Sequence, residues 1–383
     1  MKKVADTFRI GIITSVHVWN DTRIFFKEAV SLAEKGYQVT LVGISDKKRK
    51  LYRHNMTIYT IKKKRRLIRW VHWFTIMKIL FKEKIDILHF HDPELIPLGM
   101  LMKLFRKKLI FDMHEDFARQ LRDKEWIPKY IGKMLSGIYT QLERRLPRIF
   151  DRILLAEDSY LHNFSNAENI KVVRNFPRVP LEWKSEYAFE TFKMVYVGDI
   201  RTIRGIKEYI KILEVSLKGG LNVQLLIIGN FAEKSLETET KERIKSEGLA
   251  THVKFLGRLP NEGIYPVLKE CDIGLALLHP VKNYVDSYPT KIFEYMAAGL
   301  PTLASNFALW QDIILRNECG CCVQPFDTDE AYGVIKSYYF SEDLRRKHGE
   351  NGRNAILARY NWENEERALY GAYQSLTGGV LKI

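Results

Sequence analysis

Short apolar runs alternate with amphipathic stretches along the first half of the chain. Seven runs have the length and the flanking polar residues of buried strands, at residues 8–14, 38–45, 56–61, 86–91, 108–114, 152–158 and 171–175. Between them, stretches such as 22–35 and 93–106 repeat apolar residues at helical spacing. Strands that alternate with helices predict βαβ units and therefore a mainly parallel sheet.

The same alternation starts again after a segment with two prolines, residues 175–180. Six further strand-like runs follow, at residues 193–199, 223–230, 253–258, 273–278, 302–305 and 321–325. The chain then ends on a helical pattern over 360–376, in which Trp362, Leu369 and Tyr373 can share one face.

We therefore predict an α/β fold with two doubly wound, Rossmann-like domains. The expected domains are residues 1–177 and 178–359, with the C-terminal helical segment 360–383 packed back on the first. A length of 383 residues agrees with two domains. Sheets of this kind bind ligands at the carboxyl ends of their strands, so we expect a cleft there between two facing domains.

The charge is distributed unevenly. Residues 1–180 carry 36 Lys and Arg against 19 Asp and Glu, whereas residues 181–383 carry 25 against 27, so the excess of +15 lies in the first half. Four cysteines without a framework of pairs favour a reducing compartment. With no signal-peptide core and no apolar run of about 18 residues, we expect a cytoplasmic protein.

One basic stretch, residues 62–84, also carries Trp70, Trp73, Phe74 and Phe81. A basic, aromatic, amphipathic helix is typical of contact with an anionic membrane surface, and residues 103–108 add more positive charge. Two other interpretations stay open: a nucleic-acid contact, or a helix whose aromatic side chains pack in the core. No recognised nucleic-acid module accompanies the patch, so we predict no nucleic-acid partner.

The stretch SYPTKIFEYMAAGLPTLAS, residues 287–305, has the pattern of a helix that binds an anion at its start. Pro289 suits the first helical position, and the free amides that follow suit an anion. Lys291 adds a positive charge, and Glu294, one turn further, can accept hydrogen bonds from hydroxyl groups. Phosphate together with neighbouring hydroxyls describes a nucleotide.

This stretch and the two-domain layout resemble the retaining GT-B nucleotide-sugar glycosyltransferases of family four. Further likeness comes from TSVHVWNDTRIFFKEAVSLAEKGYQVTLVG, HFHDPELIPLG, FDMHED and YVGDIRTIRGI, which follow in the same order. These motifs resemble those of the branch of the family that builds bacterial surface polysaccharides.

The resemblance implies roles for the residues around this helix. The family's Glu-x7-Glu hallmark stands here as Asp286-x7-Glu294, with aspartate at the first position. Glu294 would bind the ribose hydroxyls, Pro289, Thr290 and Lys291 the diphosphate, and Asp286 the sugar hydroxyls. An exposed Glu294 paired with Lys291 is the alternative from spacing alone.

The family also places a basic pair in the loop after the first strand of the second domain. Here GDIRTIRGI offers Arg201 and Arg204 followed by Gly205, with arginine in place of the usual lysine. Cations at this point would stabilise the charge that develops on the leaving diphosphate. Gly229 and the backbone around Arg258, at two further strand ends, would approach the nucleotide.

In the first domain the resemblance places His114, at the end of a strand, against the donor sugar. His17, Asp21 and Arg23 lie in the loop after the first strand, where we expect recognition of acceptor or donor. His91 is a further acceptor-side candidate. It is also compatible with a structural role, because Asp92 can cap a helix that starts at Pro93.

The predicted function is transfer of a sugar from a UDP- or GDP-linked donor to a saccharide or lipid-linked saccharide, with retention. Beyond the nucleotide sugar no cofactor is expected. No metal is expected either, since in the motif DTD, residues 327–329, Asp327 or Thr328 fits a helix cap better than a metal site. Acceptors of this kind imply a protein at the inner face of the cell membrane. Two alternatives stay open: a GT-B nucleotide-sugar epimerase, and a non-catalytic protein that binds membrane or nucleic acid.

Overall fold

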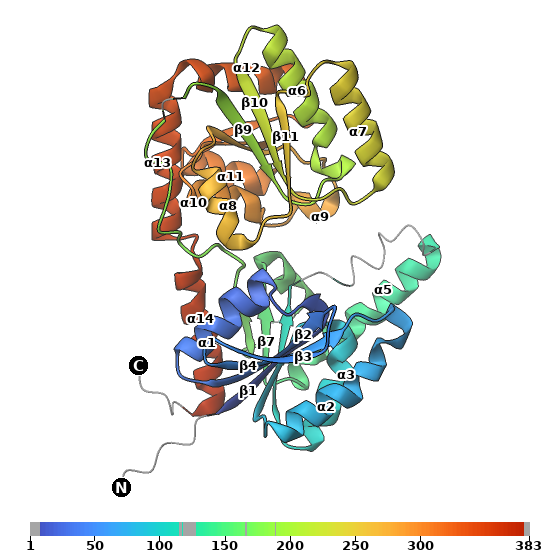
Figure 1. Cartoon of the computed structure of the whole chain (residues 1–383). Helices are drawn as coiled ribbons and strands as arrows, with labels where there is room; N and C mark the ends of the chain where they lie inside the picture. Colours follow the sequence, from blue (N-terminus) through green and yellow to red (C-terminus); the bar gives the residue numbers. More distant parts are fainter. Residues whose placement is uncertain (1–7, 115–116, 118–127, 165–166, 188, 379–383) are drawn as a thin grey trace. The chain divides into compact units, whose positions relative to one another are not determined.

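The computed structural model describes residues 8–114, 117, 128–164, 167–187 and 189–378. The chain forms two compact units. Unit 1 combines residues 1–175 with 362–383, and unit 2 comprises residues 176–361 (Figure 1). The expected domain boundaries lie about two residues from these.

The described part of unit 1 forms an eight-stranded sheet in the order β3-β4-β2-β1-β5-β6-β7-β8. Neighbouring strands are parallel except for β3, which pairs antiparallel with β4. In chain order the elements are β1 (Arg9–Val18), η1 (Thr22–Ala29), α1 (Val30–Glu34), β2 (Gln38–Ser45), β3 (Arg49–Arg53), β4 (Met56–Lys62), η2 (Arg66–Val71), α2 (His72–Lys82), β5 (Ile87–Phe90), η3 (Pro93–Leu95), α3 (Ile96–Leu104), β6 (Lys108–Met113), α5 (Lys129–Glu143), η4 (Leu146–Arg148), β7 (Arg152–Leu155), η5 (Asp158–Asn163), β8 (Ile170–Val172) and α14 (Trp362–Thr377).

Successive residues of these strands face opposite sides of the sheet. Ile87 and Ile110 pack beneath η1, α1 and α14, whereas Phe90 and Phe111 pack beneath α2 and α3. The first set of helices covers one side of the sheet in Figure 1, and α2, α3 and α5 cover the other. The strands β1, β2, β5, β6 and β7 are therefore mostly buried on both faces, which explains their continuous apolar runs.

The sequence pattern does not reveal two features of unit 1. The segment expected to be one regular helix over 22–35 begins as a π-helix, η1, before α1 continues it. Asp21 caps η1 by accepting hydrogen bonds from the amides of Arg23 and Ile24. The exposed strand β3, which has no apolar run, is an edge strand.

Unit 2 contains a six-stranded parallel sheet in the order β11-β10-β9-β12-β13-β14. Its elements are β9 (Phe192–Val197), η6 (Thr202–Arg204), α6 (Ile206–Lys218), β10 (Val223–Ile228), α7 (Lys234–Ser246), β11 (Val253–Gly257), α8 (Asn261–Leu268), β12 (Ile273–Ala276), α9 (Lys282–Val285), α10 (Thr290–Ala297), β13 (Thr302–Ser305), α11 (Ala308–Arg316), β14 (Gly320–Val323), α12 (Thr328–Phe340) and α13 (Glu342–Ala358). The apolar sides of α6 and α12 pack on one face of this sheet, and those of α10, α11 and α13 on the other.

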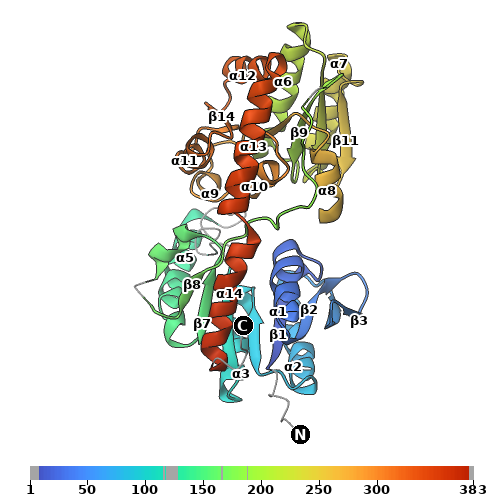
Figure 2. The same cartoon turned by 90° about the vertical axis from the view of Figure 1, so that its left-hand side faces the viewer.

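The C-terminal helix α14 is part of unit 1 and lies beside β8 (Figure 2). Trp362 is fully buried, and its indole N–H donates to the Ser31 hydroxyl at 2.9 Å. Tyr370 donates to the Ser31 carbonyl, and the Tyr373 hydroxyl lies 2.8 Å from His89 Nδ1. The last helical segment of the chain therefore completes the core of the unit that the first residues begin.

We predict that Trp362→Ala destabilises unit 1 by about 3–5 kcal/mol, because it leaves a large cavity under η1 and α1. Urea unfolding, followed for the transition of unit 1, measures the loss. Trp70→Ala is the matched control: Trp70 is 54% exposed, so its removal should change stability by less than about 0.5 kcal/mol. Equal unfolding midpoints for wild type and Trp362→Ala would show that α14 does not support this core.

Candidate functional site

Two glycines bring the loops at the carboxyl end of β9 close together. A Cβ on Gly229, whose φ is 153°, would lie 1.9 Å from the Gly198 carbonyl oxygen. A Cβ on Gly205, whose φ is 85°, would lie 2.0 Å from the Leu277 carbonyl oxygen. A larger residue at either position would push these loops apart, so both glycines shape the end of the sheet.

Arg204 is the last residue of η6, directly before Gly205. Its Nε donates a hydrogen bond to the Tyr284 hydroxyl of α9 at 3.1 Å. Its Nη1 lies 4.0 Å from Asp199 Oδ2, at the edge of an ion pair. The guanidinium is thus held in place mainly by a neutral phenol, which leaves most of its charge for another partner.

Lys291 is the second residue of α10, and its Nζ lies 5.2 Å from the centroid of the Tyr196 ring. Burial and the nearby positive charge of Arg204 lower the pKa of Lys291 to about 7. Glu294 and Asp199 act in the opposite direction, but with smaller effects. The two cations therefore repel one another where an anion could bind between them.

The start of α10 differs by one residue from the prediction. Pro289 is the N-cap, with extended backbone, and Thr290 is the first helical residue. The shift follows from the ψ of 97° at Pro289, which is not helical. Proline offers no side-chain acceptor as a cap, so helix geometry leaves the amides of Thr290 and Lys291 without a partner within the helix.

The other predicted residues of unit 2 lie at the ends of its strands and short helices. Asp286 ends α9 and is exposed, three residues before Pro289. Arg201 is the exposed N-cap residue of η6, and Arg258 is the exposed residue that follows β11. Gly257, next to Arg258, accepts a hydrogen bond from the Gly229 amide at 2.8 Å.

In unit 1, several predicted residues meet above the ends of β5 and β6. His114 Nε2 lies 3.0 Å from His17 Nε2, and His114 Nδ1 lies 3.7 Å from Asp112 Oδ1. The side chain of His17 is 25% exposed, and that of His114 is 17% exposed. Arg23 is buried and forms a charge-assisted hydrogen bond of 2.7 Å to Asp112.

His91 belongs to the same cluster, but it lies in the interior with 1% exposure. Its ring nitrogens lie 3.4 Å from Glu28 Oε2 and 3.8 Å from Asp112 Oδ1. Asp21 lies at the border of the cluster, 4.0 Å from His17 Nδ1, while it caps η1.

Asp92 is the N-cap residue of η3, and Pro93 is the first residue of that helix, as predicted. The Asp92 carboxylate, however, makes no cap hydrogen bond to η3. It accepts instead from the Thr14 hydroxyl and from the amide and hydroxyl of Ser15. These donors lie within β1, where its register with β2 is irregular between Ile13 and Val18, so Asp92 ties the start of η3 to this part of the strand.

Burial sets the protonation of the acids and histidines beneath His114. Burial raises the pKa of Glu28 well above its usual value, and the nearby charge of Asp112 adds to this effect. Burial alone would also raise the pKa of Asp112, but Arg23 and three histidines together hold it well below its usual range. Burial lowers the pKa of His91 well below 6.5. Asp112 is thus the ionised partner of Arg23.

Sequence reasoning did not single out Glu28, His89 and Asp112 in unit 1, or Tyr196 and Tyr284 in unit 2. For unit 1 a signal was present: His89 and His91, like Asp112 and His114, are two apart in a strand and must face the same side. The tyrosines give no such signal: Tyr196 lies in β9 and reads as an ordinary core residue, and Tyr284 lies in the short helix α9, which the pattern does not predict.

Two family models match the chain, one in each unit. The model described as Glycosyltransferase Family 4 matches residues 23–176, and that described as Glycosyl transferases group 1 matches residues 181–355. Together they span most of the sequence. The chain belongs to the family four glycosyltransferases.

Curated relatives and solved structures agree with this assignment. Phosphatidyl-myo-inositol mannosyltransferase of Mycobacterium leprae is 22% identical over 307 residues, which cover 78% of this chain and 75% of the relative. The capsular polysaccharide biosynthesis glycosyltransferase CapM of Staphylococcus aureus is 26% identical over 193 residues, which cover 48% of this chain and 47% of the relative.

Among solved structures, sucrose-phosphate synthase of Thermosynechococcus elongatus superposes with a TM-score of 0.73 at 15% identity, covering 97% of this chain and 99% of its own. HepE of Anabaena in complex with UDP-glucose superposes with a TM-score of 0.69 at 14% identity, covering 96% of this chain and 99% of its own. These likenesses identify the fold of this glycosyltransferase as GT-B.

The lowered pKa of Lys291 can be tested by chemical labelling. We predict that an amine-selective acetylating reagent, applied over a pH series and read by mass spectrometry, gives a midpoint near 7 for Lys291. Arg204→Ala should raise this midpoint, because it removes a positive neighbour, and Glu294→Gln should lower it. Lys282, an exposed lysine of α9, serves as the internal reference. A labelling midpoint that stays the same in both variants would show that Arg204 and Glu294 do not set the pKa of Lys291.

Proposed function

We propose that this glycosyltransferase transfers a hexose from a UDP- or GDP-linked donor to a saccharide or lipid-linked saccharide acceptor, with retention of the anomeric configuration. Its role would be the synthesis of a bacterial surface polysaccharide. The observation that carries the proposal is the pair of cations, Arg204 and Lys291, beside the free amides of α10.

Two cations and a helix N-terminus fit the diphosphate of a nucleotide sugar. Binding a dianion relieves the repulsion between Arg204 and Lys291 and supplies an acceptor for the amides of Thr290 and Lys291. As the glycosidic bond breaks, negative charge grows on the leaving diphosphate. The same two cations then stabilise the transition state more than the bound donor.

The residues around the cations suit the rest of a nucleotide. Glu294, one helical turn beyond Lys291, would accept hydrogen bonds from the ribose hydroxyls, and Asp286 from the sugar hydroxyls. Gly229 and the backbone around Arg258 would approach the base, and the exposed Arg201 would add a further contact to the phosphates. HepE, which shares the fold, was solved with UDP-glucose, which supports a uridine nucleotide as a candidate.

In unit 1 the partly exposed pair His17 and His114 would contact the sugar and the acceptor. The buried Arg23 and His91 would hold Asp112 in position, and Asp112 in turn would orient the neighbouring His114. The name of CapM assigns that relative to capsular polysaccharide biosynthesis, which supports a saccharide as the acceptor class.

Retention would follow from attack on the same face of the sugar, with the leaving phosphate accepting the proton of the acceptor. No side chain of the described site is a clear nucleophile for a covalent intermediate. Proton NMR of the first product tests this point, since a retained anomer supports the proposal and an inverted one overturns it.

The rival activity is epimerisation of a nucleotide sugar in the same cleft of a GT-B fold. An epimerase would form product without an acceptor, whereas a transferase needs one. Incubation of the protein with the donor alone therefore separates the two activities.

We predict that one nucleoside diphosphate among UDP, GDP and ADP raises the melting temperature of the wild-type protein at micromolar concentration. Glu294→Ala should lose this stabilisation, because the ribose hydroxyls lose their acceptor, whereas Glu242→Ala, an exposed glutamate of α7, should keep it. In a transfer assay, Arg204→Ala and Lys291→Ala should each lower kcat/KM by about ten- to a hundredfold, the effect of one charge-assisted hydrogen bond. Equal stabilisation of wild type and Glu294→Ala would contradict the proposed ribose site.

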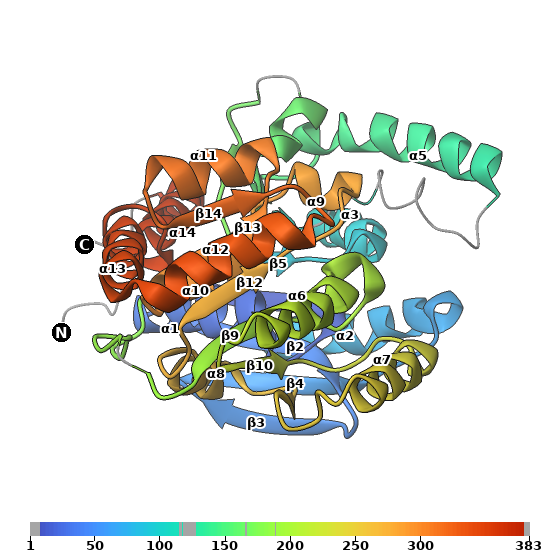
Figure 3. The same ribbon diagram turned by 90° about the horizontal axis from the view of Figure 1, so that it is seen from above.

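We also propose that unit 1 contacts an anionic membrane through the outer faces of α2, α3 and α5, called here the helical face. The three helices follow one another along one side of the sheet (Figure 3). Trp70, Phe74, Phe81, Leu104 and Phe105 are exposed on η2, α2 and at α3, as are Tyr130, Met134, Ile138 and Leu142 on α5.

The exposure of the aromatic side chains in residues 62–84 supports the membrane interpretation of this stretch. Trp73 is partly buried against the core, but Trp70 and Phe74 are more than half exposed. The exposed Lys78, Lys82 and Arg106 lie among these side chains. Exposed apolar residues with basic neighbours suit an anionic bilayer. Among the described residues no helix has the length and hydropathy needed to span a bilayer.

We predict that the protein sediments with vesicles that contain anionic phospholipid and not with phosphatidylcholine vesicles. Replacing Tyr130, Met134 and Ile138 together by Ser should weaken this binding at least tenfold, through the loss of buried apolar area. Leu181→Ser, at a fully exposed leucine of unit 2, is the control and should leave binding unchanged. Binding that is unaffected by the triple substitution would exclude α5 from the contact.

A further inference from the structure

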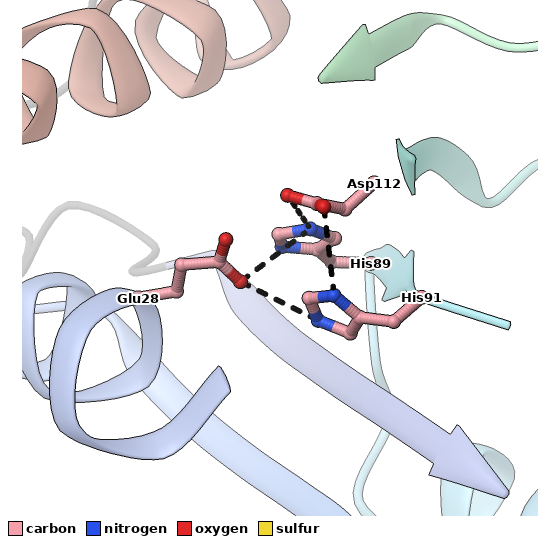
Figure 4. A group of neighbouring side chains, drawn as sticks. All are labelled: Glu28, His89, His91 and Asp112. Carbon is pink, nitrogen blue, oxygen red and sulfur yellow. Dashed lines mark ion pairs between the residues drawn. The ribbon is translucent and has the colours of Figure 1, made fainter. Parts of the chain in front are cut away.

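Four side chains of unit 1 meet in its interior beneath His114. They are Glu28 of η1, His89 of β5, His91 just after β5, and Asp112 of β6 (Figure 4). None is more than 1% exposed. One nitrogen or carboxylate oxygen from each lies within 4.8 Å of those of the other three.

The fold itself brings these groups together. Phe90 pairs with Phe111 in the parallel ladder of β5 and β6, so His89 and His91 are near Asp112 on the neighbouring strand. Side chains two residues apart face the same side, so all three point toward η1, which carries Glu28.

Several polar atoms of the cluster have no hydrogen bond within the part of the chain that the structure describes. They are both carboxylate oxygens of Glu28, both ring nitrogens of His91 and Nε2 of His89. Buried polar groups in native proteins are almost always paired, so a group of this kind needs an explanation.

Arg23 provides a partner for only some of these buried atoms. Its Nε lies 2.9 Å from Glu28 Oε1, and its Nη2 lies 2.7 Å from Asp112 Oδ2. Glu28 Oε2 faces the other way, 3.4 Å from His91 Nε2 and 3.9 Å from His89 Nε2. One guanidinium thus pairs with two buried carboxylates, and no Lys or Arg among the described residues pairs with the oxygen of Glu28 that faces the imidazoles.

The His89 imidazole is oriented as a ligand. The Tyr373 hydroxyl lies 2.8 Å from His89 Nδ1. With the Nδ1–H donating to the Tyr373 oxygen, the lone pair of Nε2 is directed into the cluster. Histidines that bind metals usually donate a hydrogen bond from their second ring nitrogen in this way. Carboxylate ligands usually accept hydrogen bonds as well, and here Arg23 is the donor to the carboxylate of Asp112.

The distances also suit a small ion. A tetrahedral zinc site with bonds of about 2.0–2.1 Å separates its ligand atoms by about 3.3 Å. His89 Nε2 lies 3.8 Å from Asp112 Oδ2 and 3.9 Å from Glu28 Oε2, and His91 Nε2 lies 3.4 Å from Glu28 Oε2. All four ligand atoms lie within 4.8 Å of one another, so the ion would draw the most distant pair together by up to about 1.5 Å.

We propose that Glu28, His89, His91 and Asp112 bind one divalent transition-metal ion, such as Zn²⁺, in a structural site. Two imidazoles and two carboxylates suit such an ion and not Mg²⁺, which prefers oxygen ligands and retains water. Four protein ligands, all buried, leave no open position, so the ion takes no part in sugar transfer. It ties η1 to β5 and β6 and, through Tyr373, to α14. From the sequence we expected no metal.

The test uses untagged, full-length protein purified without chelator. Elemental analysis by mass spectrometry should find about one equivalent of a transition metal. A strong chelator should lower the melting temperature, and Zn²⁺ should restore it, while Mg²⁺ should not. Loading with Co²⁺ should give the visible absorption of a nitrogen- and oxygen-ligated tetrahedral site, a readout that needs no variant.

His91→Gln and Glu28→Gln should each reduce the bound metal at least tenfold. His252→Gln, a histidine of unit 2, and Cys322→Ser, in the cysteine-rich β14, are controls that should retain it. The proposal is overturned if wild-type protein neither contains metal nor responds to Zn²⁺. Retention of metal by His91→Gln, or its loss from Cys322→Ser, would equally overturn it by assigning the ion to another site.

Discussion

The repulsion between Arg204 and Lys291 is the constraint on which the account of unit 2 depends. The protein holds two cations near each other: Arg204 donates to the Tyr284 hydroxyl and lies 4.0 Å from Asp199, and Lys291 lies over the Tyr196 ring. Such an arrangement is unfavourable in the empty protein, and an anion relieves it. The glycines at 205 and 229 make the arrangement possible, because they let the loops that carry the site approach closely.

Unit 1 depends on a second buried set of charges. Arg23, Glu28 and Asp112 lie beneath the partly exposed histidines, so the surface pair His17 and His114 rests on a fixed internal network. The last helix, α14, takes part through Tyr373 and Trp362. The first and last segments of the chain therefore have to fold together before this end of the sheet is complete.

The sequence was enough to predict most strands, because each is buried on both faces and reads as an apolar run. It also singled out Lys291 and Glu294 by their spacing and Arg204 by the resemblance to the family, and the roles of these three residues stay predictions. It did not predict the edge strand β3 or the π-helical start of η1, which follow from tertiary contacts and not from local pattern. It missed Glu28 because a single buried charge on a helix has no periodicity of its own, and it overlooked the spacing that places Asp112 on the same side as His114. Asp92 was placed correctly at the start of η3, but its hydrogen bonds to Thr14 and Ser15 could not be foreseen because these partners are distant in sequence.

The most direct test of the central claim is a crystal structure of the full chain with the nucleoside diphosphate that stabilises it. The account predicts density for the diphosphate against the guanidinium of Arg204, the ammonium of Lys291 and the amides at the start of α10, with the ribose at Glu294. Nucleotide bound elsewhere, with Arg204 still on Tyr284 and no anion beside Lys291, would contradict it.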